Sequence, residues 1–90
     1  MSDFPFVQHK KDGYIVREFD SSVNEQELVW HMDEHDRLVE VIEGNQWQLQ
    51  YDNKLPEVLQ ENKKYFIPKL SWHRVIRGNG KLKIKIYEYK

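Results

Sequence analysis

Ninety residues make one domain with a small core, which a metal or a partner subunit, most simply in a homodimer, would help to stabilise. The 14 lysines and arginines nearly balance the 15 aspartates and glutamates, which argues against a dedicated nucleic-acid binder. The chain has no cysteine for a disulfide, and its apolar runs fit neither a secretory signal nor a membrane span, so we expect a soluble cytoplasmic protein.

The first part of the chain predicts an arm followed by a strand. Residues 1–13 alternate only loosely in hydropathy and end in the turn signal Asp12-Gly13, so we expect an N-terminal arm there. Residues 14–19 (YIVREF) form a short run rich in aromatic and β-branched side chains, which is typical of a strand.

Residues 23–43 allow two interpretations. A capping box precedes them and their apolar residues have helical spacing, so they could form one amphipathic helix. In that helix the sequence HMDEH (31–35) would match a zinc-protease pattern. We favour two strands, at residues 28–30 and 38–42, because β-branched and aromatic residues are dense in both. The pair Gly44-Asn45 then predicts a hairpin.

The rest of the chain predicts strands throughout. Residues 47–51 (WQLQY) alternate strictly, and residues 65–67 form a short apolar run that a proline ends. Residues 72–76 make a further strand, and residues 82–86 alternate isoleucine or leucine with lysine. About seven short strands separated by turn signals predict an all-β sandwich or barrel.

Two segments, HMDEHDRLVEVIEG and PKLSWH, place histidines at fixed distances from a glycine or a proline. This spacing resembles the two motifs of small single-domain cupins, G-x5-HxH-x3,4-E-x6-G and G-x5-PxG-x2-H-x3-N. The resemblance covers about residues 25–88 and implies a cupin-type β-barrel (double-stranded β-helix or jelly roll), with residues 1–90 as a single domain. The motif positions that match are His31, Gly44, Pro68 and His73. Glu25, Asp33, Arg37, Asn62, Leu70 and Arg77 depart from the motifs.

The resemblance implies a candidate metal site. His31 and Asp33 would point inward from one strand, because side chains two residues apart share a face, and His73 would approach from a facing strand. Two imidazoles and a carboxylate can hold a divalent metal such as Fe, Mn, Ni or Zn with positions left open. Arg37 stands where the family has a glutamate, and its guanidinium stays charged. It either pairs with Asp33 in a metal-free polar core or faces the pocket and binds an anion.

Further candidates for ligand binding lie on the predicted strands. Either Gln48 and Gln50 face into the barrel and make a polar cavity, or the apolar residues between them do and fill it; we favour the filled core. Arg74 could extend an anion site around Arg37. His35 reads as a solvated loop residue. The tryptophans read as core or dimer contacts.

Three functions follow from these residues. The first is a small cupin with a polar pocket that binds a small anionic or hydroxylated ligand, with no assigned reaction. The second is a divalent-metal-dependent enzyme of the oxygenase, isomerase or lyase type. The third is a structural dimer with an inert pocket. The pocket in each case is built around His31, Asp33, Arg37 and His73.

Overall fold

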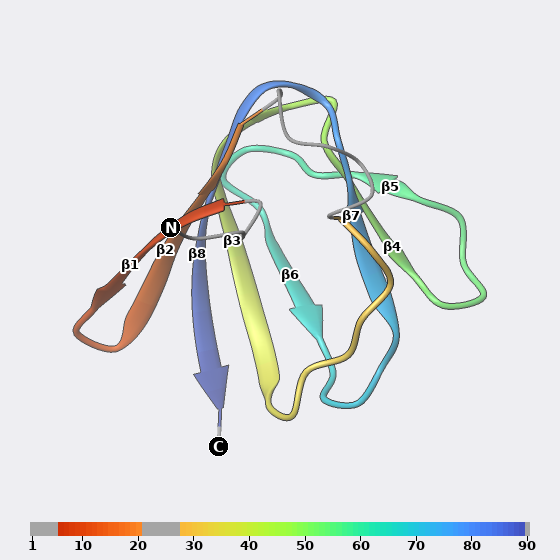
Figure 1. Ribbon diagram of the computed structural model, residues 1–90, viewed down its shortest axis with the longest axis horizontal. Coiled ribbons are helices and arrows are strands. Elements are labelled where there is room, and N and C mark those ends of the chain that lie inside the picture. The colour runs from red at the N-terminus through yellow and green to blue at the C-terminus, as the bar shows by residue number, and fades with distance from the viewer. Residues whose placement is uncertain (1–5, 21–27, 90) are drawn as a thin grey trace.

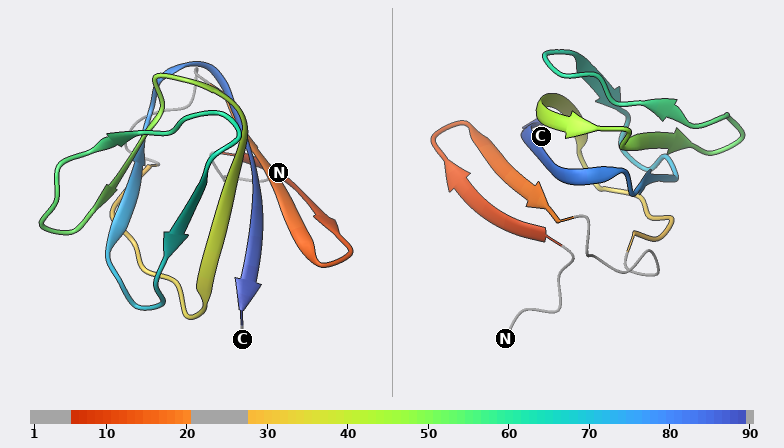
Figure 2. Two further views of the ribbon diagram at one scale, coloured as in Figure 1. Left: turned by 180° about the vertical axis from the view of Figure 1, so that it is seen from behind. Right: turned by 90° about the horizontal axis from the view of Figure 1, so that it is seen from above.

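The structure, a computed structural model, describes residues 6–20 and 28–89, and the regular elements of this part of the chain are all strands. They form two antiparallel sheets, ordered β1-β2-β8-β3-β6 and β5-β4-β7, which face each other (Figures 1 and 2). No helix in these residues has the length and hydropathy needed to cross a membrane. The strands are β1 (Phe6–Lys11), β2 (Tyr14–Phe19), β3 (Asp36–Asn45), β4 (Gln48–Tyr51), β5 (Glu57–Val58), β6 (Lys64–Ile67), β7 (His73–Ile76) and β8 (Asn79–Tyr89). The all-β prediction is therefore confirmed.

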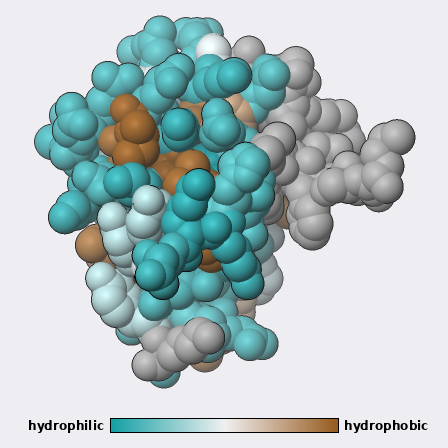
Figure 3. All heavy atoms as spheres, turned by 90° about the vertical axis from the view of Figure 1, so that its left-hand side faces the viewer, coloured by the Kyte–Doolittle hydropathy of each residue, from teal (hydrophilic) through white to brown (hydrophobic). Residues whose placement is uncertain are grey.

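The core lies between the sheets because side chains alternate between the two faces of each strand. In β8, Leu82, Ile84 and Ile86 are buried, and the lysines between them lie on the other face. Trp47, just before β4, and Leu49 in β4 are buried, so the apolar residues face the interior there, as we expected, although they leave a cavity. On the side of the β1–β2 hairpin the outer surface is mostly hydrophilic (Figure 3). The other buried apolar residues are Phe19, Val39, Val41, Leu59 and Ile67, each worth roughly 1.5–3 kcal/mol when fully buried.

The segment that we expected to be an arm is partly a strand. Phe6–Lys11 forms β1 and pairs with β2, with Gln8 opposite Arg17. Strand β1 lies at the edge of the larger sheet and pairs only with β2. An edge strand does not require a strict alternation of apolar and polar residues. This pairing matters for the site, because it places Gln8 beside an arginine of the cavity wall.

The interpretation of residues 23–43 as one helix is wrong over the part that the structure describes, because Asp36–Asn45 is strand β3. The strand expected at residues 28–30 is also not formed. This segment meets its neighbour at a single isolated bridge, between His31 and His73. Residues 21–27, where the capping box and the start of the cupin resemblance fall, lie outside the described residues.

The hairpin predicted at Gly44-Asn45 is wrong. Strand β3 continues through both residues, and the chain then turns at Gln46 (φ 63°) and crosses into the other sheet. Shifts of register near the end of β3 mark β-bulges, which bend a strand. The Gly-Asn pair indicates only a local preference for a turn. The crossover to the other sheet is favoured by a contact that this preference does not include, the burial of Trp47 between the sheets.

Two of the crossings between the sheets, from β3 to β4 and from β7 to β8, lie together at one end of the barrel (top of Figure 1). The two crossovers pack backbone against backbone at Gly78. A Cβ atom at this position would overlap backbone atoms of Asn45, Gln46 and Trp47. Only glycine allows this close approach, so Gly78 holds this end of the barrel closed.

Candidate metal centre

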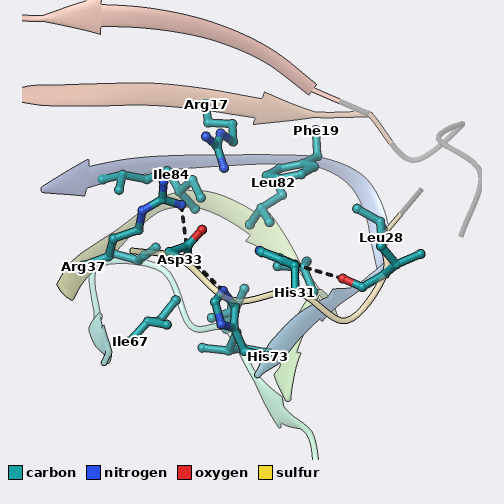
Figure 4. Close-up of a pocket in the computed structure, with 16 residues that line it drawn as sticks. Arg17, Phe19, Leu28, His31, Asp33, Arg37, Ile67, His73, Leu82 and Ile84 are labelled. Atoms are coloured by element: carbon teal, nitrogen blue, oxygen red, sulfur yellow. Dashed lines mark hydrogen bonds and ion pairs between the residues drawn. The ribbon is translucent and has the colours of Figure 1, made fainter. Parts of the chain in front are cut away.

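A cavity of about 330 Å³ lies inside the barrel (Figure 4). Most of its wall is apolar, including Leu82, Ile84 and Ile86 of β8. In Figure 4 a carboxylate, that of Asp33, lies between two arginines and two histidines. The polar residues of the wall are Arg17, His31, Asp33, Arg37 and His73.

The segment before β3 carries two of these residues and is fixed to its neighbours by backbone hydrogen bonds. The backbone N–H of His31 donates to the backbone carbonyl of His73 (3.0 Å), and the backbone N–H of His73 donates to the backbone carbonyl of His31 (2.9 Å). The carbonyl of Asp33 accepts from the backbone N–H of Leu70 at 2.7 Å. Asp36 accepts from the backbone N–H of Lys69 at 2.8 Å. These contacts hold His31 and Asp33 in position although they lie outside any regular strand.

Backbone carbonyls set the orientation of both imidazole rings. Nδ1 of His31 lies 2.9 Å from the oxygen of Val29, and Nδ1 of His73 lies 2.9 Å from the oxygen of Ser71. Because a carbonyl oxygen can only accept, each Nδ1 carries the proton. In the neutral ring, Nε2 then holds the lone pair. Histidines that bind metals are commonly oriented by such a hydrogen bond on the other nitrogen.

The carboxylate of Asp33 completes a group of three donors. Its Oδ2 lies 3.3 Å from Nε2 of His73 and 3.3 Å from Nη1 of Arg37. The contact with Arg37 attracts by charge, and that with His73 does so only when the imidazole is protonated. Neither contact has the geometry of a hydrogen bond, and Oδ2 is buried without one. One ligand atom from each of His31, Asp33 and His73 lies within 4.8 Å of the others. A buried oxygen that lacks a hydrogen bond fits a divalent cation at this point.

The surroundings of Asp33 keep it ionised. Burial alone would raise the pKa of its carboxyl, but the contact with His73 and the charge of Arg37 outweigh burial, so the pKa lies below its usual value. A metal needs the ionised carboxylate, so Asp33 is available as a ligand at neutral pH.

We expect the metal-free protein to lose stability in acid through Asp33. Its folded-state pKa is below the unfolded value near 4, so its stabilisation is present above about pH 5 and is lost as the pH falls through the folded pKa. Urea unfolding of wild type and Asp33→Asn at about pH 5.5 and about pH 3.5 measures this. The free energy of unfolding should fall more in the wild type; an equal fall in both proteins would contradict the prediction.

Arg37 pairs with two carboxylates and also lines the cavity. Its Nε and Nη2 lie 3.0 and 2.9 Å from one oxygen of Glu88, which faces it across β3 and β8. Its Nη1 is the atom near Asp33. The sequence left open whether Arg37 pairs with Asp33 or faces the pocket, and in the structure it does both. Glu88, however, binds two of its three guanidinium nitrogens.

Arg17 is a wall residue that our reading of the motifs did not include. It lies in β2 between Ile15 and Phe19 on the inward face, and the structure places it on the cavity wall. A signal was present: in YIVREF, the alternation puts a cation on the same face as an isoleucine and a phenylalanine.

The other three predicted ligand-binding residues do not line the cavity in the part of the chain that the structure describes. They are Gln48, Gln50 and Arg74. Arg74 donates to Gln50 (2.8 Å) and lies over the ring of Trp30, 5.0 Å from its centroid. Gln48 and Gln50 alternate with the inward-facing Leu49, so both lie on the outer face of β4. His35 is half-buried and is not part of the three-donor group. Trp30 and Trp72 are exposed, so the role as dimer contacts stays a prediction for both.

Several solved structures share this architecture. A cupin-2 domain protein from Shewanella frigidimarina NCIMB 400 is similar with a TM-score of 0.61 and 25% identity, over 91% of this chain and 76% of that one. Protein NMB1881 from Neisseria meningitidis is similar with a TM-score of 0.64 and 15% identity, over 100% and 89%. The sequence itself matches no family profile and no curated protein.

A larger protein, HppE in its Fe(II) form, is similar with a TM-score of 0.66 and 15% identity over 84% of this chain. The chain spans only 41% of the length of HppE. HppE has also been solved with Co(II) and substrate. At these identities the likeness concerns the fold.

Proposed function

Because this chain has the fold of a small cupin, we propose that its barrel binds a divalent transition metal through His31, Asp33 and His73, and a small anionic ligand beside the metal. The observation that carries the proposal is the convergence of the three donors within 4.8 Å. Fe, Mn, Ni and Zn all accept such a set of two imidazoles and one carboxylate.

Each of the three residues is prepared for this role in a different way. The protons of His31 and His73 are on Nδ1, which leaves Nε2 to the metal. Asp33 is ionised and its Oδ2 lacks a hydrogen bond. Once bound, the metal would supply Lewis-acid chemistry to a ligand that coordinates it.

Glu88 limits the competition between Arg37 and the metal. A guanidinium 3.3 Å from Oδ2 of Asp33 opposes a second cation at that oxygen. Glu88 accepts from two of the guanidinium nitrogens and balances the charge of Arg37. This pair supports metal binding at a site where an arginine replaces the family's glutamate ligand.

Metal content tests the proposal. The protein is purified untagged and without chelators, and bound metal is measured by inductively coupled plasma mass spectrometry. Metal-free protein is then titrated with Co(II), and the visible absorption of the ion is followed. We expect about one bound ion per chain and saturable Co(II) binding. A protein that retains no metal and does not saturate with Co(II) would refute the proposal.

Catalysis at this metal, of the oxygenase, isomerase or lyase type, is a second candidate. Three protein ligands leave coordination positions open, and the cavity of about 330 Å³ adjoins them, so a ligand in the cavity would reach the metal. The fold itself does not choose a reaction. Consumption of a ligand by the metal-loaded protein, absent in the metal-free protein, separates catalysis from binding alone.

A further inference from the structure

The segment that carries His31 has few backbone contacts where it enters the site. Residues 28–30 make no backbone–backbone hydrogen bond within the part of the chain that the structure describes, and the segment pairs with β7 only at the bridge between His31 and His73. Leu28 packs against the core on the inner side. Because a segment with few backbone hydrogen bonds opens locally at a low free-energy cost, side-chain contacts decide how firmly His31 is held.

Trp30 makes such a contact on the outer face of the barrel. It directly precedes His31 but does not line the cavity, so its side chain points the other way. The guanidinium of Arg74 lies over its ring, 5.0 Å from the centroid, which is a favourable cation–π contact. Arg74 belongs to β7 and directly follows His73. The contact therefore joins the segment of His31 to the strand of His73 from the outside.

Arg74 is itself fixed by the smaller sheet. Its Nε donates to Oε1 of Gln50 at 2.8 Å, and Nε2 of Gln50 donates to the backbone carbonyl of Lys54 at 3.0 Å. Gln50 lies opposite Arg74 in β4, the middle strand of this sheet. Trp30, Arg74 and Gln50 therefore form a row across the outer face, and this row ties the segment of His31 to two strands.

The position of Trp30 also sets the orientation of the His31 ring. Nδ1 of His31 donates to the carbonyl oxygen of Val29 at 2.9 Å (dashed in Figure 4). That carbonyl belongs to the peptide unit that joins Val29 to Trp30. The unit is planar and rigid, so a shift of Trp30 would move the carbonyl and, with it, the imidazole. Trp30 thus acts through one peptide unit on Nε2 of His31, the atom that is left to the metal.

The other histidine of the site is oriented without such a side-chain contact. Nδ1 of His73 donates to the carbonyl of Ser71, in the peptide unit that precedes Trp72. Here the backbone carbonyl of Trp72 accepts from the backbone N–H of Asp52 at 2.9 Å, and His73 begins β7. The ring of Trp72 makes no stacking or cation–π contact with a described residue. The backbone therefore holds His73, whereas a side chain holds His31.

We infer that Trp30 and Arg74 form a clamp on the outer face of the barrel, which positions His31 for a metal bound on the inner face. This inference rests on the proposed function. Neither residue lines the cavity, so both are positioning residues rather than ligands. The clamp and a metal held by His31 and His73 would join the same two segments from opposite faces. Without the clamp, metal binding must also order the segment of His31, and the affinity falls.

Co(II) titration of the metal-free protein tests the inference in the wild type, Trp30→Ala, Trp30→Phe and Arg74→Met. Trp72→Ala is the matched control. Trp72 also directly precedes a histidine of the site and is similarly exposed, 47% against 38% for Trp30, but it lacks the contact across the two segments. Circular dichroism confirms folding of each variant.

A second measurement needs no metal. A protease that cleaves after glutamate is applied to the metal-free proteins, and mass spectrometry follows cleavage after Glu34, which lies in the segment of His31. Cleavage after Glu61, in a turn elsewhere in the chain, is the internal reference. When opening and closing are fast, the rate of cleavage reports how often the segment opens.

Trp30→Ala should weaken Co(II) binding roughly tenfold and change the shape of the visible absorption bands, because the ring of His31 is displaced. Trp30→Phe keeps an aromatic ring under the guanidinium and should restore most of the affinity. Arg74→Met should also weaken Co(II) binding, although removal of a positive charge would by itself favour a cation. Trp72→Ala should change the affinity less than about twofold, as is usual for an exposed side chain without specific contacts.

In the metal-free protein, cleavage after Glu34 should be faster in Trp30→Ala and Arg74→Met than in the wild type. Cleavage after Glu61 should stay the same in every variant, and Trp72→Ala should be cleaved as the wild type is.

The inference is overturned if Trp30→Ala binds Co(II) as the wild type does, if Trp72→Ala weakens binding as much, or if Arg74→Met tightens it. Should Trp30→Ala fail to fold, Arg74→Met and the control decide. Failure of the proposed function is seen separately, as a wild type that does not bind Co(II). The clamp is then judged by cleavage after Glu34, and an unchanged rate in Trp30→Ala and Arg74→Met overturns it.

Discussion

The variant His73→Ala is expected to lose stoichiometric metal binding. His73 is 3% exposed, and its Nε2 is the donor that lies nearest to Asp33. Removing a group that merely orients a ligand weakens metal binding about 10–100-fold, so removing the ligand itself should weaken it by more than about a hundredfold. The metal content of the purified variant and competition for Co(II) with a chelator measure the loss.

The matched control is His35→Ala. His35 belongs to the same short segment as His31 but lies outside the group of three donors. Its removal should leave one bound ion per chain. If both variants retain the metal, or if both lose it equally while remaining folded, His73 is not a ligand. Alanine at position 73 also leaves a small void, so the thermal unfolding midpoint of each variant is measured alongside.

The variant Gly78→Ala is expected to lose at least about 3 kcal/mol of unfolding free energy, or to fail to fold. The added Cβ would overlap backbone atoms of Asn45, Gln46 and Trp47. A backbone cannot swing aside as a side chain does, so the two crossovers would have to separate. Trp47 is fully buried beside them, and its packing would be lost as well. Urea unfolding followed by tryptophan fluorescence measures the change.

The control is Gly80→Ala, two residues further along the chain, in β8. A Cβ at Gly80 meets nothing within 4 Å, but Gly80 has a φ of +66°, which an alanine adopts at a cost of about 1 kcal/mol. The loss at Gly80 should therefore be modest. Equal losses at the two positions would show that conformational strain, rather than the contact between the crossovers, dominates at Gly78.

The predictions that held depend on residues close together in the chain. The alternation in β8 identified its buried face, since the period of two is a local property of a strand. The grouping of His31, Asp33 and His73 came instead from the resemblance to two cupin motifs, and the structure brings these three residues together. Each motif is a short pattern that can be read from a single sequence.

The predictions that failed depend on contacts between distant segments. Residues 28–30 contain two residues that favour strands, yet Val29 and Trp30 are exposed, and this segment pairs with β7 only at the isolated bridge between His31 and His73. The hairpin at Gly44-Asn45 was replaced by a crossover that buries Trp47. The partner of Arg37, Glu88, lies 51 residues away, and only the pairing of β3 with β8 brings them together. None of these is encoded within a local window.

The two backbone hydrogen bonds between His31 and His73 also make their amide protons reporters of occupancy. Without metal, the segment that carries His31 is joined to β7 by a single bridge, so it can detach locally and let both amides exchange with solvent. A metal held by both rings crosslinks the segment to the strand, and exchange then requires that a coordination bond break first. Slow exchange at these two amides, with unchanged exchange in the middle of β8, would record a loaded site in the intact protein.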